Sequence, residues 1–62
     1  MDRITLTVHE NGTATARGIF TDSRDNRNSL NRTYATEQQA RQEFHDMRER
    51  GAEFSYTINR KA

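Results

Sequence analysis

The sequence lacks cysteine, so neither a disulfide framework nor a thiolate metal site can stabilise this 62-residue chain. It also lacks long apolar runs. The N-terminal stretch has none of signal-peptide length, and no segment approaches the roughly 20 residues that a membrane span requires. These absences predict a cytoplasmic protein in a reducing compartment, with no disulfide and no membrane segment.

Apolar residues are scarce, and the charges nearly cancel. Only 31% of the residues are hydrophobic, and 10 basic against 9 acidic residues leave a net charge of +1. A chain of this length predicts one domain, residues 1–62, with a thin core near the lower limit for independent folding. A partner or a homodimer could therefore add stability. The charge is too low for a polycation that binds DNA strongly and too positive for an acidic DNA mimic.

Residues that carry chemistry are few and scattered. The two histidines, His9 and His45, lie in different predicted elements, without the further ligands that a metal site needs. No nucleophile stands beside a base, and no phosphate-binding or dinucleotide-binding motif is present. Acids that precede bases by four residues indicate a solvated helix face. These pairs are Glu37 with Arg41 and Asp46 with Arg50. The sequence thus predicts no enzyme activity, no catalytic residue, no metal and no cofactor.

Residues 36–51 have the start, the apolar stripe and the stop of one helix. Thr36 followed three residues later by Gln39 has the form of a capping box, in which the threonine hydroxyl is expected to accept the N3 amide and the glutamine side chain to return to the cap amide. The apolar stripe is Ala40, Phe44 and Met47. Gly51 supplies the left-handed residue that ends the helix. The spacing predicts about four turns with one narrow buried face.

Two predicted strands flank a turn around Gly12, and the type of turn sets their register. A two-residue type I′ turn would place polar residues opposite Val8 and Leu6. A three-residue loop over residues 10–12, with Gly12 left-handed, gathers apolar and small residues on one face. Its pairs are Ile4 with Gly18, Leu6 with Ala16 and Val8 with Ala14. We predict this second register, because its strip of small residues lets the helix approach the sheet closely.

The remaining segments complete a β-β-β-α-β order. Residues 21–29 contain no apolar side chain and many turn formers, which predicts an exposed loop. Residues 30–34 form a short third strand, and residues 54–59 alternate apolar and polar as the fourth. A right-handed crossover places the last strand parallel to the first, in spatial order 3-2-1-4. The predicted fold class is α+β, a single antiparallel-rich sheet with one helix packed on one face.

Candidate partner-binding residues lie on the polar loop, on the third strand and on the sheet face that the helix leaves uncovered. They are Arg17, Asp22, Arg24, Asp25, Arg27 and Arg32. Arginine offers a planar fork that suits carboxylate or phosphate. Arg32 would point inward beside Leu30 and Tyr34, unless the third strand is an edge strand from which Arg32 snorkels to solvent. The alternative for the loop and the face is plain solvated surface, and the face could also serve dimerisation.

Residues 8–44 run through a strand, a Glu-Asn-Gly turn, a second strand, a polar loop, a third strand and a helix start of Thr-Glu-Gln. The residues that carry this pattern are Val8, Glu10, Asn11, Gly12, Thr36, Glu37, Gln38 and Phe44. In this succession the chain resembles small phage anti-CRISPR proteins that inhibit type I CRISPR-Cas effectors. The resemblance implies a short, cytosolic, non-enzymatic phage or mobile-element protein. Such a protein binds a Cas surface and blocks target DNA or recruitment of the nuclease.

A second pattern consists of three strands that end in an aromatic-x-Thr step before a helix, with Tyr34, Thr36 and Ala40 at its positions. It is similar to the N-terminal arm-binding domain of phage-type tyrosine integrases. That resemblance implies a sheet presented to the DNA major groove, with Arg17 and the threonines as contacts. These 62 residues depart from the family in holding no catalytic domain and no lysine excess. A small DNA-binding module is therefore the alternative function.

Overall fold

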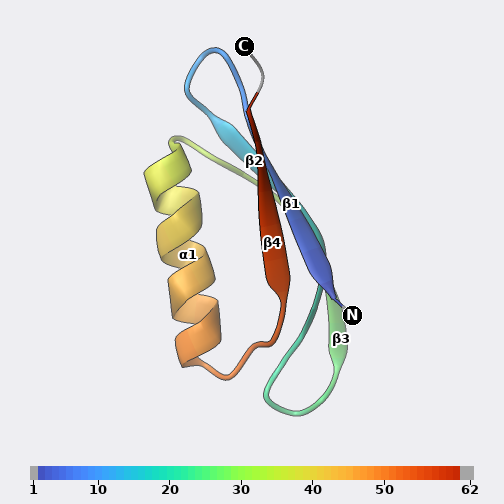
Figure 1. Cartoon of the computed structure of the whole chain (residues 1–62). Helices are drawn as coiled ribbons and strands as arrows, with labels where there is room; N and C mark the ends of the chain where they lie inside the picture. Colours follow the sequence, from blue (N-terminus) through green and yellow to red (C-terminus); the bar gives the residue numbers. More distant parts are fainter. Residues whose placement is uncertain (1, 61–62) are drawn as a thin grey trace.

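The computed structural model describes residues 2–60 and has an α+β fold with one helix and one four-stranded sheet (Figure 1). The elements are β1 (Arg3–Val8), β2 (Ala14–Thr21), β3 (Arg27–Tyr34), α1 (Glu37–Glu49) and β4 (Ser55–Arg60). The strands lie in the order β3-β2-β1-β4, antiparallel except for the parallel pair of β1 and β4. The predicted fold class and strand order are both confirmed.

The β1–β2 hairpin has the register predicted from its apolar residues. Its pairs include Ile4 with Gly18, Leu6 with Ala16 and Val8 with Ala14. The His9 backbone N–H donates to the Thr13 carbonyl at 2.8 Å, so three residues form the loop, and Gly12 has φ +92°. Glycine adopts this left-handed conformation without steric cost. The three-residue loop therefore turns the apolar residues of both strands to the same side.

The third strand is longer than predicted. Residues 27–29, expected in the loop, belong to β3 and pair with residues 19–21 of β2, so the loop contains only residues 22–26. β3 is an edge strand, and backbone hydrogen bonds to β2 hold residues 27–29 although none of their side chains is fully buried. The absence of apolar residues was therefore a misleading sign of a loop. β4 also begins and ends one residue later than the predicted 54–59.

The ends of α1 follow the predicted signals. The Thr36 hydroxyl accepts the Gln39 backbone N–H at 3.2 Å, as in a capping box. The reciprocal bond from the Gln39 side chain is absent from the hydrogen bonds of residues 2–60. Gly51 has φ +94° directly after the C-cap residue Arg50, so it supplies the predicted left-handed stop.

Only one of the two predicted acid–base pairs forms on α1. Arg41 Nη1 lies 3.7 Å from Glu37 Oε2. The Asp46 carboxylate instead accepts the Gln42 side-chain amide at 3.2 Å, and no ion pair joins Asp46 to Arg50. Arg50 is the C-cap residue, directly after the last residue of the helix, and its backbone N–H donates to the Asp46 carbonyl at 3.1 Å.

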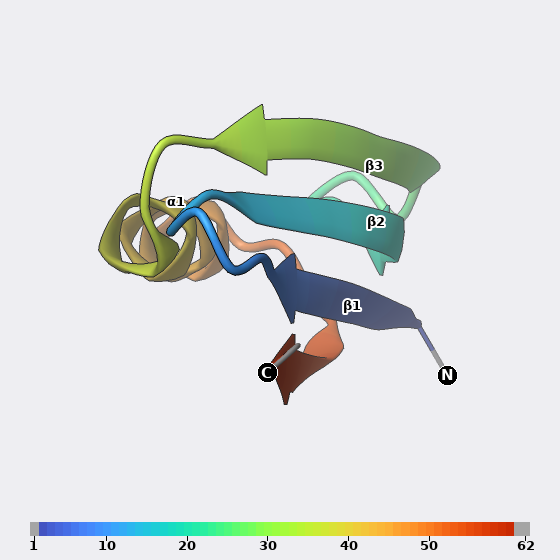
Figure 2. The same ribbon diagram turned by 90° about the horizontal axis from the view of Figure 1, so that it is seen from above.

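The helix packs on the strip of small residues that this register creates. Figure 2 shows α1 beside β2, with β3 on one side and β1, then β4, on the other. The buried side chains are Ile4, Leu6, Ala14, Ala16, Ala40, Phe44 and Met47. Gly18 continues the strip without a side chain. A Cβ at this position would overlap the backbone of β1. The predicted contact between the apolar stripe of α1 and the small residues of β2 is confirmed.

The chain reaches β4 by crossing the end of β2. Glu53 and Thr21 exchange backbone hydrogen bonds of 2.7 and 3.1 Å, and the Ser55 N–H then donates to the Asp2 carbonyl at 3.1 Å. β4 thus lies one strand beyond β1, whereas the helix lies over β2 and β3. Side chains bridge the remaining space between α1 and β4: the Phe44 and Tyr56 ring centroids lie 4.7 Å apart, and Arg60 pairs with Glu37.

Candidate functional site

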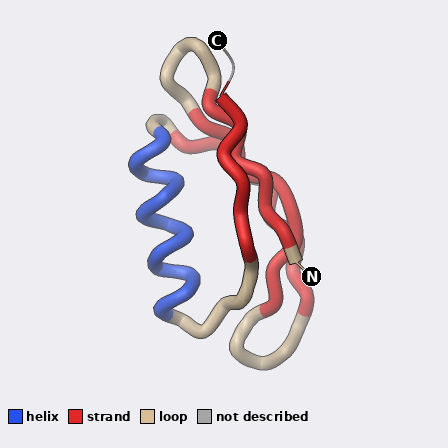
Figure 3. The backbone as a smooth tube through the Cα atoms, in the orientation of Figure 1, coloured by secondary structure: helices blue, strands red, loops and turns tan. Residues whose placement is uncertain are grey.

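The sheet has one face that no helix covers (Figure 3). Its members are every second residue from Arg3 in β1, from Thr15 in β2, from Arg27 in β3 and from Ser55 in β4. Most of them are threonine, serine, asparagine or arginine. We call this surface the open sheet face.

No acidic residue occupies a strand position of the open sheet face. All nine acids lie within residues 2–60; four belong to α1, and the other five lie in loops or before β1. Those five are Asp2, Glu10, Asp22, Asp25 and Glu53. Three arginines, Arg3, Arg17 and Arg27, are on the face. The small net charge of the chain is therefore the sum of a basic sheet face and an acid-rich helix.

Arg17 lies at the centre of the open sheet face. Its strand, β2, is flanked by β1 and β3, where Thr5 and Asn31 are its register partners. The side chain is exposed and forms no ion pair with another residue in 2–60. Ile19, two residues further along the strand, is 44% exposed and is the exposed large hydrophobic residue of this part of the chain. Arginine is one of the residues enriched at protein interfaces.

A chain of hydrogen bonds orders the end of the open sheet face nearest the β1–β2 turn. The His9 Nε2 atom lies 2.9 Å from the Thr15 hydroxyl, which lies 3.2 Å from the Thr33 hydroxyl. These three side chains come from three neighbouring segments of the sheet. They are therefore oriented before any partner binds, which lowers the entropy cost of binding.

The loop between β2 and β3 is organised by Asp22. Its carboxylate accepts the backbone N–H groups of Arg24 and Asn26, at 2.9 and 3.0 Å, and the Asn28 side-chain amide at 3.1 Å. The hydrogen bond from Asn26 is the largest cause that lowers the pKa of Asp22. Asp25 has φ +64°, in the left-handed region that the tight loop requires. Asp22 is thus engaged within the loop, whereas Arg24 and Asp25 are exposed.

The six predicted residues do not form one site. Two lie on the open sheet face, three in the β2–β3 loop and one, Arg32, on the helix side of the sheet. Arg27 Nε is 3.5 Å from Asp2 Oδ1, and Arg32 Nη1 is 3.6 Å from Glu43 Oε1 of α1. The Arg32 side chain is 63% exposed on an edge strand, so it snorkels to solvent as expected.

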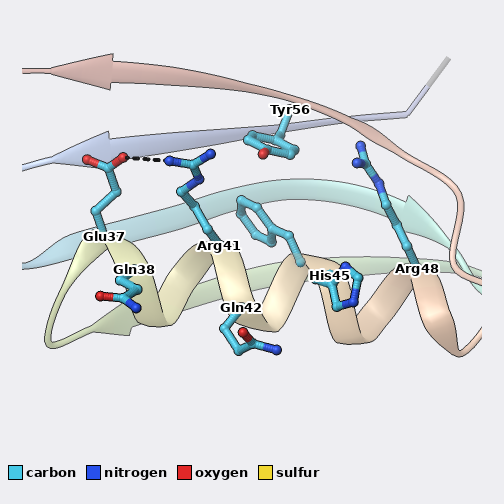
Figure 4. A pocket seen from close by; sticks show the side chains of 8 residues that line it. Glu37, Gln38, Arg41, Gln42, His45, Arg48 and Tyr56 are labelled. Atoms are coloured by element: carbon cyan, nitrogen blue, oxygen red, sulfur yellow. Dashed lines mark ion pairs between the residues drawn. The ribbon is translucent and has the colours of Figure 1, made fainter.

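A groove between α1 and β4 is a second candidate site, which the sequence interpretation missed (Figure 4). Its volume is about 670 Å³. The lining residues are Glu37, Gln38, Arg41, Gln42, Phe44, His45, Arg48 and Tyr56. The half-buried Tyr56 ring makes its apolar floor, and the buried Phe44 ring lies beneath it, with the two centroids 4.7 Å apart. We call this feature the α1–β4 groove.

Arginines border the α1–β4 groove at both ends. Arg48 Cζ lies 5.4 Å from the Tyr56 ring centroid, and Arg48 Nη2 donates to the Phe54 carbonyl at 3.2 Å. At the other end, the Arg60 guanidinium donates to both Glu37 oxygens at 2.5 and 3.0 Å. These Arg60 hydrogen bonds are the largest cause that lowers the pKa of Glu37. Arg41 also pairs with Glu37, so two guanidinium groups contact this carboxylate, and Arg48 lies at the opposite end of the groove.

The spacing of the groove residues was visible in the sequence. Glu37, Arg41, Phe44 and Arg48 follow at intervals of four, three and four residues, which places them along one helix face. The first two were interpreted as a solvated ion pair. The groove itself depends on where α1 sits over the sheet, and helix periodicity does not contain that information.

Other features of residues 2–60 add little to these two surfaces. No helix there is long and apolar enough to cross a membrane. No three histidine, cysteine or acidic side chains of the described chain lie together as a metal site would require. Comparisons with protein-family models, with curated proteins and with solved structures find no match for this chain.

Proposed function

We propose that this protein is a non-enzymatic binding protein and that the open sheet face is its contact surface. One observation carries the proposal: three arginines share a face that has no acidic residue at its strand positions, in a chain that is nearly neutral overall. Guanidinium groups form strong charge-assisted hydrogen bonds with carboxylates and phosphates. The expected partner therefore presents one of these groups.

The specific partner that we propose is a host defence complex, a type I CRISPR-Cas effector, in the cytosol of the host cell. This choice rests on the resemblance of residues 8–44 to small phage anti-CRISPR proteins. An inhibitor of this kind acts by covering a surface of the effector, so that target DNA or the nuclease cannot bind. Complementary charge would set the orientation and the association rate of such a complex.

Co-purification with a panel of type I effectors tests this function, with DNA binding and target cleavage measured in parallel. We expect co-elution with one effector and a loss of its DNA binding or cleavage. Arg17→Gln should weaken inhibition, whereas the matched change Arg50→Gln, at an exposed site outside the open sheet face, should not. The absence of co-elution and of inhibition across the panel would refute the anti-CRISPR assignment. Equal effects of the two variants would exclude the open sheet face as the contact surface.

A small DNA-binding module is the second candidate, and the separation of charges favours it. The overall charge balance argues against DNA, but none of the acids that create this balance occupies a strand position of the open sheet face, and within residues 2–60 Asp2 alone among them pairs with an arginine of that face, Arg27. Arginine, asparagine and threonine are also the side chains that contact phosphates and base edges. Three arginine contacts predict that the logarithm of affinity falls with the logarithm of salt concentration with a slope of roughly −3. Undetectable retention of duplex DNA at low ionic strength would remove this candidate.

A further inference from the structure

The outer edge of β4 has backbone groups available for another strand. Within residues 2–60, β4 pairs only with β1, at the end of the strand order β3-β2-β1-β4. The Ser55 N–H donates toward β1, to the Asp2 carbonyl. Because the backbone groups of successive residues in a strand point to opposite sides, those of Tyr56, Ile58 and Arg60 point to the outer edge. An extended segment can pair with these groups.

The α1–β4 groove lies next to this same edge. Tyr56 belongs to both, since its backbone points to the outer edge and its half-buried ring forms the groove floor. α1 lies over β2, so a strand added beside β4 would not collide with the helix backbone (Figure 2). Alternate side chains of an added strand project to the helix side of the sheet. They would therefore enter the groove, while the others face solvent.

The charge of the groove selects the kind of segment that fits. The groove and its ends carry three guanidinium groups, those of Arg41, Arg48 and Arg60, but one lining carboxylate, that of Glu37, which is paired with Arg41 and Arg60. Arg48 is held in place by its stacking on Phe54 and Tyr56 and uses one of its five N–H donors on the Phe54 carbonyl. The remaining donors suit a carboxylate. An acidic segment is therefore favoured over a basic one.

We propose that the edge of β4 and the α1–β4 groove bind an extended acidic segment of a partner protein by strand addition. An aromatic side chain of the segment packs on the half-buried ring of Tyr56, and flanking carboxylates bind Arg41 and Arg48. A second copy of this chain is a poorer occupant, because pairing of two β4 edges would bring two basic grooves together. This surface is separate from the open sheet face, so the proposal does not depend on the proposed function.

An NMR titration with the blocked peptide TETFTET tests the proposal, because its two glutamates and its phenylalanine share one face of a strand. We expect saturable shifts of the Tyr56, Ile58 and Arg60 amides, with the open sheet face unaffected. The matched peptide TKTFTKT should bind at least about tenfold more weakly, since the loss of one hydrogen bond to a charged group lowers the affinity by about a factor of ten. Shifts located elsewhere, or equal binding of the two peptides, would overturn the proposal.

Methylated peptides separate strand addition from side-chain binding. A strand presents every second backbone amide to its neighbour. We therefore expect N-methylation of every second amide of TETFTET to abolish binding in one of the two possible patterns and to leave binding unchanged in the other. Binding of both methylated peptides would overturn strand addition.

Variants of the protein provide the second control. We expect Arg41→Gln to weaken binding of TETFTET and Arg24→Gln, in the β2–β3 loop, to leave it unchanged. Equal affinities of these two variants would contradict the role of the groove. Without peptide, the β4 amide shifts should not depend on protein concentration. If they did, and light scattering gave the mass of a dimer, the occupant would be a second copy of the chain and the proposal would be overturned.

Discussion

Replacing Phe44 by alanine should remove a large part of the stability of this domain. The side chain is 1% exposed, and its ring centroid lies 4.7 Å from that of Tyr56 and 5.6 Å from that of Phe54. The lost burial and the cavity left behind make such a change cost about 3–5 kcal/mol. Tyr56 and Phe54 are only partly buried and can move into the cavity. We therefore expect a cost near the lower end, about 3 kcal/mol.

This cost is large compared with the total stability of so short a chain. At roughly 0.05–0.15 kcal/mol per residue, the free energy of unfolding of 62 residues is roughly 3–9 kcal/mol. Urea denaturation followed by circular dichroism measures the change directly. With a slope of about 1 kcal/mol per molar urea for a small protein, the midpoint should fall by about 3 M. Phe44→Leu, which keeps most of the volume, should cost about 1 kcal/mol and remains measurable if the alanine variant does not fold.

Gln42→Ala is the matched control, since Gln42 lies on the same helix and is exposed. Its free energy of unfolding should stay within about 0.5 kcal/mol of the parent value. If Phe44→Ala and Gln42→Ala had the same urea midpoint, the packing of α1 on the small residues of β2 would be refuted.

Three further predictions concern the backbone, the helix cap and an ion pair. Gly18→Ala should destabilise by about 3 kcal/mol, because its Cβ would overlap the backbone of β1; an unchanged melting temperature would contradict this close approach. Thr36→Ala should cost about 1 kcal/mol, because the Gln39 N–H loses its acceptor, whereas Thr36→Ser should retain most of the stability in the same denaturation assay. Arg60 lowers the pKa of Glu37 below its usual 4.5, so this pair stabilises the fold above pH 4.5, and the contribution is lost as the pH falls through the folded-state pKa. The difference in urea midpoint between the parent and Arg60→Gln should therefore shrink on acidification from pH 7, and a constant difference would disprove the linkage.

The sequence was sufficient to predict those elements whose start, buried side and end depend on residues close together in the chain. The Thr36 cap, the apolar stripe that includes Phe44, and Gly51 act within one helix, so their spacing alone locates α1. The hairpin register also follows from the sequence, because a shift of one residue would turn a whole strand face away from the core. β3 was predicted too short for the opposite reason: an edge strand is held by backbone pairing, which side-chain composition does not report.

The sequence predicted an uncovered sheet face with Arg17, but its separation from the acids and the α1–β4 groove appear only in the tertiary structure. Strand alternation places Arg3, Arg17 and Arg27 on one side of the sheet and leaves the acids on α1 and in the loops, whereas the summed charge of the chain is nearly zero. The small residues of β2 draw α1 away from β4, and this offset opens the groove that Arg48 borders. The sequence by itself thus determined the elements, their order and the pairing of β1 with β2. The distribution of charge over the surface and the position of the groove depend on contacts between residues far apart in the sequence. Only the tertiary structure therefore decided these two features.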